Sequence, residues 1–115
     1  GTANDIQQIR AATFDEDGDL LAVGRGDELL VWKITGWRRE ILRTQVEGIS
    51  KIKFDPSGDL LYVSATDRLL VLDLFKGVIS TLQPPGITTF DVSDDGHLLF
   101  WGDEGGNLHM WRAGK

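Results

Sequence analysis

A pattern that occurs three times, with a period of about 40 residues, constrains this chain more than any other feature. The starts of the three copies lie 40 and 38 residues apart. The copies run over Ile9–Ile34, Ile49–Leu74 and Ile87–Ala113. In each, an apolar residue precedes a glycine by four positions, and a pair of leucines follows; the apolar residues are Phe14, Phe54 and Val92. A repeat of this length predicts structural units that stack on one another and share a hydrophobic core.

Each repeat is typical of four short β-strands. In the middle copy, Asp55–Gly58 has the composition of a turn, because proline presets φ and glycine accepts positive φ. Pro84–Gly86 ends the unit. We expect the strands of this copy over Ile49–Phe54, Leu60–Ser64, Leu69–Leu74 and Val78–Leu82. No segment has a sustained helical period, so the predicted fold class is all-β.

The central strands are apolar almost without interruption. The runs are Leu20–Val23, Leu29–Trp32, Leu60–Val63, Leu69–Leu72 and Leu98–Trp101. A sheet with one face in water alternates apolar and polar residues, so these strands need cover on both faces. Four-stranded antiparallel sheets stacked face to face, as the blades of a β-propeller, provide that cover. We expect Trp32, Trp101 and Trp111 to pack between blades.

Over residues 9–113, the sequence resembles the WD-repeat family. The unit length fits, and so do the ends of the expected third strands at Val31-Trp32-Lys33, Leu72-Asp73 and Trp111-Arg112. No Gly-His pair precedes a first strand, no Trp-Asp pair is complete, and Gly105 stands where the third hairpin would carry an aspartate. The middle unit is also similar to bacterial surface-layer propeller repeats. The resemblance implies propeller blades that bind partners through their loop-bearing faces and central channel.

Three blades are fewer than a propeller requires. The repeats span about 9–44, 49–82 and 87–113 of a partial propeller over 1–115, whereas closed propellers have about four to eight blades. The last repeat ends after its third strand, and Thr2–Ile6 is a candidate outer strand. The favoured interpretation is a segment of a larger propeller. The alternatives are a subunit that closes a ring with copies of itself, for example two chains giving six blades, and a piece that completes another protein's propeller.

Composition excludes several classes of function. The chain has 12 basic and 18 acidic residues, a formal net charge of −6 and no cysteine. Disulfides, thiolate nucleophiles and zinc sites that need sulfur are therefore excluded. The acidic balance argues against nucleic acid as a partner. Because no apolar run approaches the roughly 18 residues of a membrane span, we expect an intracellular protein, cytoplasmic or nuclear, without a membrane partner.

The motifs that suggest chemistry each have a structural explanation. Asp15–Asp19 is similar to part of a calcium loop, but it aligns with the same turn in the other two repeats. Arg25–Asp27 matches the integrin-recognition tripeptide, yet its glycine and aspartate also suit a tight hairpin. His97 and His109 have no metal-ligand spacing, and no nucleophile–base–acid set can be assembled. We expect no catalytic residue, no metal and no cofactor.

Five residues are candidates for partner binding. Trp37 follows the third strand of the first repeat, without an equivalent at matching length in the second. A tryptophan beside Arg38 and Arg39 has the composition of an interface hot spot. The alternative is that Trp37 folds back over the blade edge with an arginine stacked on it. Arg10 and Lys51 lie at the starts of first strands, which line the channel of a propeller, and could hold an anion or acidic peptide there.

These observations favour a non-catalytic scaffold or adaptor for protein–protein interaction. Its partners would be other proteins or further propeller blades, from the same chain or another. Because the turns after the first strands are acidic, we expect a basic partner surface there. Two alternatives remain: the self-assembling ring subunit described above, and a channel-site hydrolase or oxidoreductase whose site residues lie outside this chain.

Overall fold

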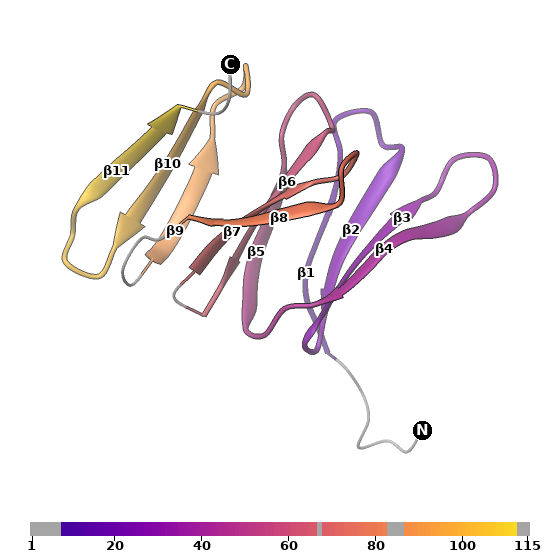
Figure 1. Cartoon of the computed structure of the whole chain (residues 1–115), viewed down its shortest axis with the longest axis horizontal. Coiled ribbons are helices and arrows are strands. Elements are labelled where there is room, and N and C mark those ends of the chain that lie inside the picture. The colour runs from indigo at the N-terminus through magenta and orange to yellow at the C-terminus, as the bar shows by residue number, and fades with distance from the viewer. Residues whose placement is uncertain (1–7, 67, 83–86, 113–115) are drawn as a thin grey trace.

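The structure is a computed structural model that describes residues 8–66, 68–82 and 87–112 (Figure 1). In these residues the regular secondary structure consists of eleven β-strands, which confirms the all-β fold class. The first four are β1 (Ile9–Phe14), β2 (Leu20–Arg25), β3 (Glu28–Lys33) and β4 (Arg39–Gln45). The next four are β5 (Ile49–Phe54), β6 (Leu60–Ala65), β7 (Arg68–Asp73) and β8 (Val78–Leu82). The last three are β9 (Ile87–Val92), β10 (Leu98–Asp103) and β11 (Leu108–Arg112).

The strands form three antiparallel sheets, and each sheet comes from one repeat. The first sheet has the order β1-β2-β3-β4, the middle sheet β5-β6-β7-β8, and the third sheet β9-β10-β11. The strands of the middle repeat lie within one residue of the predicted bounds. The candidate outer strand Thr2–Ile6 and the break at Pro84–Gly86 lie outside the described residues.

One turn geometry joins the first two strands of every sheet. Its glycine has a positive φ and donates its N–H to the carbonyl of the residue three positions earlier. The φ values are 74° at Gly18, 81° at Gly58 and 77° at Gly96. In the first sheet, Asp15 Oδ1 accepts the N–H groups of Asp19 and Leu20 at 2.8 and 3.0 Å. The calcium-like sequence is therefore a turn, and the described residues contain no group of three or more acids or histidines placed to hold a metal.

The sheets lie side by side, with the middle sheet between the other two (Figure 1). Strand β5 lies against β1 and β2, and β9 lies against β5 and β6. One buried cluster fills the space between the first and middle sheets, and a second fills the space between the middle and third sheets. In β6, Leu61 and Val63 belong to the first cluster and Tyr62 to the second, which explains why this strand is apolar on both faces.

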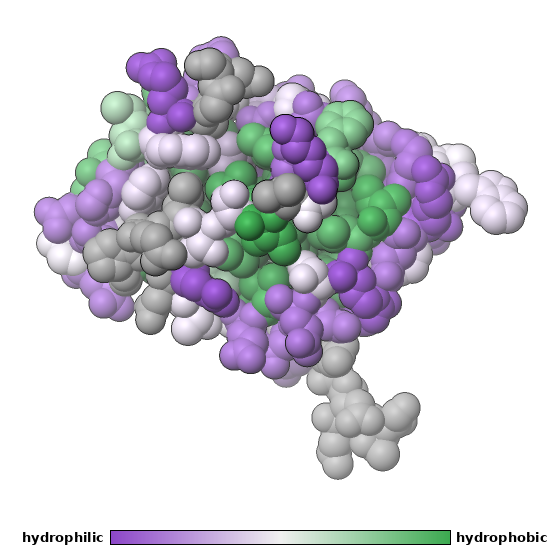
Figure 2. Space-filling view, viewed as in Figure 1, coloured by the Kyte–Doolittle hydropathy of each residue, from purple (hydrophilic) through white to green (hydrophobic). Residues whose placement is uncertain are grey.

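Within the part of the chain that the structure describes, the two end sheets are covered on one face only. Trp101 and Trp111 pack against the cluster between the middle and third sheets, as expected. Trp32 does not: it lines an open groove on the other face of the first sheet, where no further sheet lies among residues 8–66, 68–82 and 87–112. On the third sheet, Leu108 and Met110 are exposed. In Figure 2, apolar residues gather toward the centre of the view and hydrophilic residues surround them.

Candidate functional site

The connection between β3 and β4, residues 34–38, carries the most exposed aromatic side chain in the described residues. Trp37 is 85% exposed, so it does not fold back over the sheet edge. The connection starts beside the β1–β2 turn, because Ile34 N–H donates to Asp19 O at 2.9 Å. Arg38 and Arg39 follow the tryptophan and are exposed. Within residues 8–66, 68–82 and 87–112, neither arginine makes an ion pair.

The corresponding connection of the middle sheet, residues 74–77, carries Phe75, which is 84% exposed. It starts in the same way, because Leu74 N–H donates to Asp59 O at 2.9 Å. Asp73 Oδ1 accepts the N–H groups of Phe75 and Lys76, both at 3.0 Å, which holds the aromatic side chain outward. The sequence hid this match because the connection is one residue shorter. Both connections contain an aromatic residue followed by a basic one, Trp37-Arg38 in the first and Phe75-Lys76 in the second. This shared dipeptide is the sequence signal that indicates the match.

A hollow of about 300 Å³ lies between the first and middle sheets; Leu74 and Phe75 line it, but residues 34–38 do not. Ile41, Leu74 and Phe75 give it apolar walls, and Arg39 stands beside them. Lys33 also lines it, but its Nζ is 2.8 Å from Asp19 Oδ2, so its charge is largely neutralised. We call residues 34–38 and 74–77, together with this hollow, the outer rim. The rim can accept an apolar side chain beside an unpaired cation.

The two other predicted cations, Lys51 and Arg10, have different surroundings. Lys51 Nζ donates to the carbonyl oxygen of Phe90 at 2.6 Å and lies 5.0 Å from the centroid of that ring. It therefore reaches from the middle sheet toward the third. Arg10 is exposed on β1, in the first sheet, at an irregularity in the β1–β2 pairing. The anion site expected from both residues stays a prediction.

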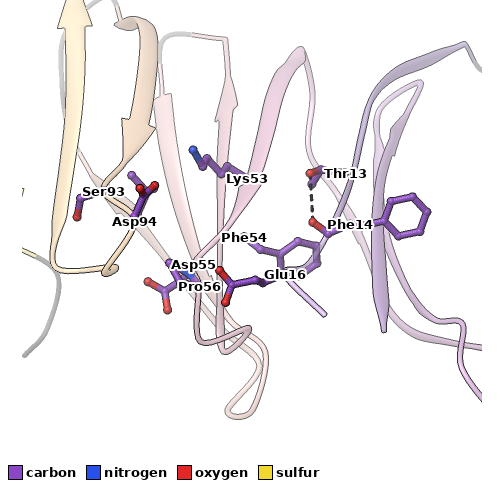
Figure 3. A pocket seen from close by; sticks show the side chains of 10 residues that line it. Thr13, Phe14, Glu16, Lys53, Phe54, Asp55, Pro56, Ser93 and Asp94 are labelled. Atoms are coloured by element: carbon purple, nitrogen blue, oxygen red, sulfur yellow. Dashed lines mark hydrogen bonds between the residues drawn. The ribbon is translucent and has the colours of Figure 1, made fainter. Parts of the chain in front are cut away.

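The acidic turns meet at a second hollow, of about 250 Å³, where the first strands of the three sheets end (Figure 3). Glu16, Asp55 and Asp94 come from successive sheets and line it together with Lys53. Asp55 is 4% exposed and accepts hydrogen bonds from the backbone and hydroxyl of Ser57. An ion pair with Lys53 lowers the pKa of Asp91 on the neighbouring sheet. Sequence patterns indicated the acidic turns but not this pair.

The β10–β11 hairpin contains a further polar cluster around Asp103. Its Oδ1 accepts the N–H groups of Gly105 and Asn107 at 2.9 and 3.0 Å, and its Oδ2 is 2.7 Å from His109 Nε2. The hydrogen bond to His109, followed by those to the turn, lowers the pKa of Asp103 to about 2. The His109 ring stacks on Trp101, with centroids 5.4 Å apart. Asp103 thus holds the hairpin in place of the aspartate expected at the position of Gly105.

No protein-family model matches this sequence, and no curated protein matches it either. Among the described residues, no helix is long and apolar enough to cross a membrane. The resemblance to WD repeats therefore stays a prediction.

Proposed function

We propose that this chain is a non-catalytic interaction module, a segment of a WD-repeat-like β-propeller that binds a protein partner at the outer rim. Each sheet is one blade in this proposal. Three antiparallel sheets in chain order, stacked so that the middle one is covered on both faces, support the propeller arrangement. Successive sheets then present equivalent connections in a row, as a scaffold does.

The observation that carries the proposal is the pair of exposed aromatic residues. Trp37 and Phe75 are 85% and 84% exposed, on equivalent connections at the same end of neighbouring sheets. Large aromatic side chains supply much of the binding energy at protein interfaces, and tryptophan with arginine is enriched at hot spots. Phe75 lines the hollow, and Trp37 stands on the equivalent connection of the neighbouring sheet, so an extended partner segment could contact both residues.

The charges of the rim favour an acidic partner segment with an apolar side chain. Arg38, Arg39 and Lys76 make no ion pair in the described part of the chain, whereas Lys33 is paired. A carboxylate of the partner would form ion pairs with these arginines at a small desolvation cost, because both groups remain exposed to water. The basic partner surface expected from the acidic turns would bind at the hollow of Figure 3, which is separate from the outer rim.

Selection from a phage-displayed library of random peptides tests the rim. We expect the selected peptides to be rich in acidic and apolar residues. Trp37→Ala should weaken their binding by at least about tenfold, since truncation of a hot-spot tryptophan typically costs that much or more. Ile79→Ala is the matched control, because Ile79 is a 44% exposed apolar residue on β8 outside the rim.

Arg38→Glu with Arg39→Glu should weaken the same peptides and reduce the salt dependence of their binding. Peptides that bind the Trp37→Ala variant and the unmodified chain with equal affinity would contradict the proposal. Peptides rich in lysine and arginine would contradict the stated chemistry of the partner.

A further inference from the structure

Among the described residues, each end sheet leaves one apolar face uncovered, and the two faces are different. We call the face of a sheet that looks toward the preceding repeat its rear face, and the opposite one its front face. The rear face of the first sheet carries Phe14, Leu21, Val23 and Trp32, around a groove of about 380 Å³. The front face of the third sheet carries Leu98, Phe100, Leu108 and Met110, as the strand pairing shows.

Equivalent residues show what the open rear face lacks. Phe54 and Val92 occupy the position of Phe14 in the middle and third sheets, and both are buried by the preceding sheet, at 6% and 4% exposure. Phe14 itself is 57% exposed. The apolar residue at this repeat position is therefore buried in the two sheets whose rear face is covered by a neighbouring front face.

The open front face shows the converse. Leu29 and Leu69 occupy the position of Leu108 in the first and middle sheets, and both are fully buried by the following sheet. Leu108 is 74% exposed. Met110 is 60% exposed, whereas its counterpart Val71 is 8% exposed. The third sheet thus keeps an apolar front face with no rear face on it in the described residues.

Both interfaces within the chain follow one rule, in which a front face packs on a rear face. The two uncovered faces are one of each kind, so they match by the same rule. They lie at opposite ends of the stack and cannot meet within one chain (Figure 1). We propose that the front face of the third sheet packs on the rear face of the first sheet of a second copy, head to tail.

A contact of this kind either closes a ring or continues as a filament. Two copies would bring six sheets together, which lies within the range of about four to eight that closed propellers have. We therefore expect a closed dimer with two identical contacts. This association goes beyond the outer rim, whose aromatic residues do not line the groove of the rear face. Ile34 and Arg38 of the rim do line that groove, so the substitutions that block the two faces leave both residues unchanged.

Light scattering after size exclusion, with sedimentation velocity, tests the association. The unmodified chain should have twice the mass of one chain. Phe14→Lys blocks the rear face and Leu108→Glu blocks the front face; both replace exposed side chains, so circular dichroism should remain unchanged. Each variant alone should be monomeric, with dimer affinity lowered at least about tenfold. Ile79→Lys, on an outer strand of the middle sheet, is the control and should remain dimeric.

Mixing the two blocked variants is the decisive step. In the mixture, one contact joins two unmodified faces, and the other contact carries both substitutions. A 1:1 complex should therefore form although neither variant dimerises alone. A monomeric unmodified chain, a blocked variant that still dimerises, or a mixture that remains monomeric would each overturn the proposal.

Discussion

At the scale of single residues, the most unusual group is the phenol of Tyr62. The side chain is fully buried between the middle and third sheets, and its hydroxyl has no hydrogen-bond partner among the described residues. Burial, with a smaller contribution from the charge of Asp55, raises the pKa of Tyr62 to about 12. A buried hydroxyl without a partner lowers stability, so the ring contributes packing and the oxygen does not.

Two measurements on Tyr62 follow. Because the folded pKa lies above the ordinary value of 10.0, the contribution of Tyr62 to the free energy of unfolding should be constant below pH 10 and fall as pH rises toward 12. Tyr62→Phe should remove that fall and raise stability at neutral pH by up to about 1 kcal/mol. Urea unfolding across this pH range measures both effects. An equal slope in the variant would assign the fall to another group.

At the scale of elements, the turn of the third sheet is fitted to the turn of the middle sheet. A Cβ added to Gly96 would lie 2.6 Å from Asp55 Oδ1 and 3.2 Å from Pro56 Cδ. Gly18 has the same place in the first turn and nearly the same φ, but a Cβ there meets nothing within 4 Å. Substitutions at Gly18 and Gly96 therefore separate the loss of stability due to a positive φ from the loss due to crowding between sheets.

Gly18→Ala should lower the free energy of unfolding by about 1 kcal/mol, the cost of a side chain in the left-handed region. Gly96→Ala should cost at least about 1 kcal/mol more, because Asp55 is buried and Pro56 is rigid. Urea unfolding of both variants gives the comparison. Equal losses would mean that the middle turn moves aside freely.

The sequence predicted the elements well and the site only in part. The strands of the middle repeat were predictable because apolar runs and turn residues are local signals. The prediction for Trp32 was wrong because its position in the repeat indicates which face of the sheet it lies on, but not whether another sheet covers that face. Phe75 was missed because its connection differs in length from that of Trp37, and the role of Asp103 because one extra residue shifts the third hairpin.

At the scale of the whole molecule, stability depends on contacts between neighbouring sheets. Each buried cluster joins two adjacent sheets, and the clusters share no residue. Such a stack behaves as a row of units, in which the ends open more easily than the centre. The middle sheet, covered on both faces, is the most stable unit.

Native-state hydrogen exchange should therefore show the slowest amides in β6 and β7. In the dimer, the outer sheets should also be protected, and Phe14→Lys should speed exchange in β2, β10 and β11 while leaving β6 unchanged. Mass spectrometry of peptides from each sheet measures this. Uniform exchange through all three sheets would show that the chain unfolds as one unit.

The unequal strand number of the sheets has a consequence for handling the protein. Within the described residues, β11 has a neighbour on one side only, so a row of amide and carbonyl groups is open along it. Strand β4 also lies at an edge, but it carries Arg39, Glu40 and Arg43, charges that discourage further pairing. Strand β11 has one arginine, Arg112, at its end and exposes the apolar Leu108 and Met110, so fibrous precipitation on storage would start there.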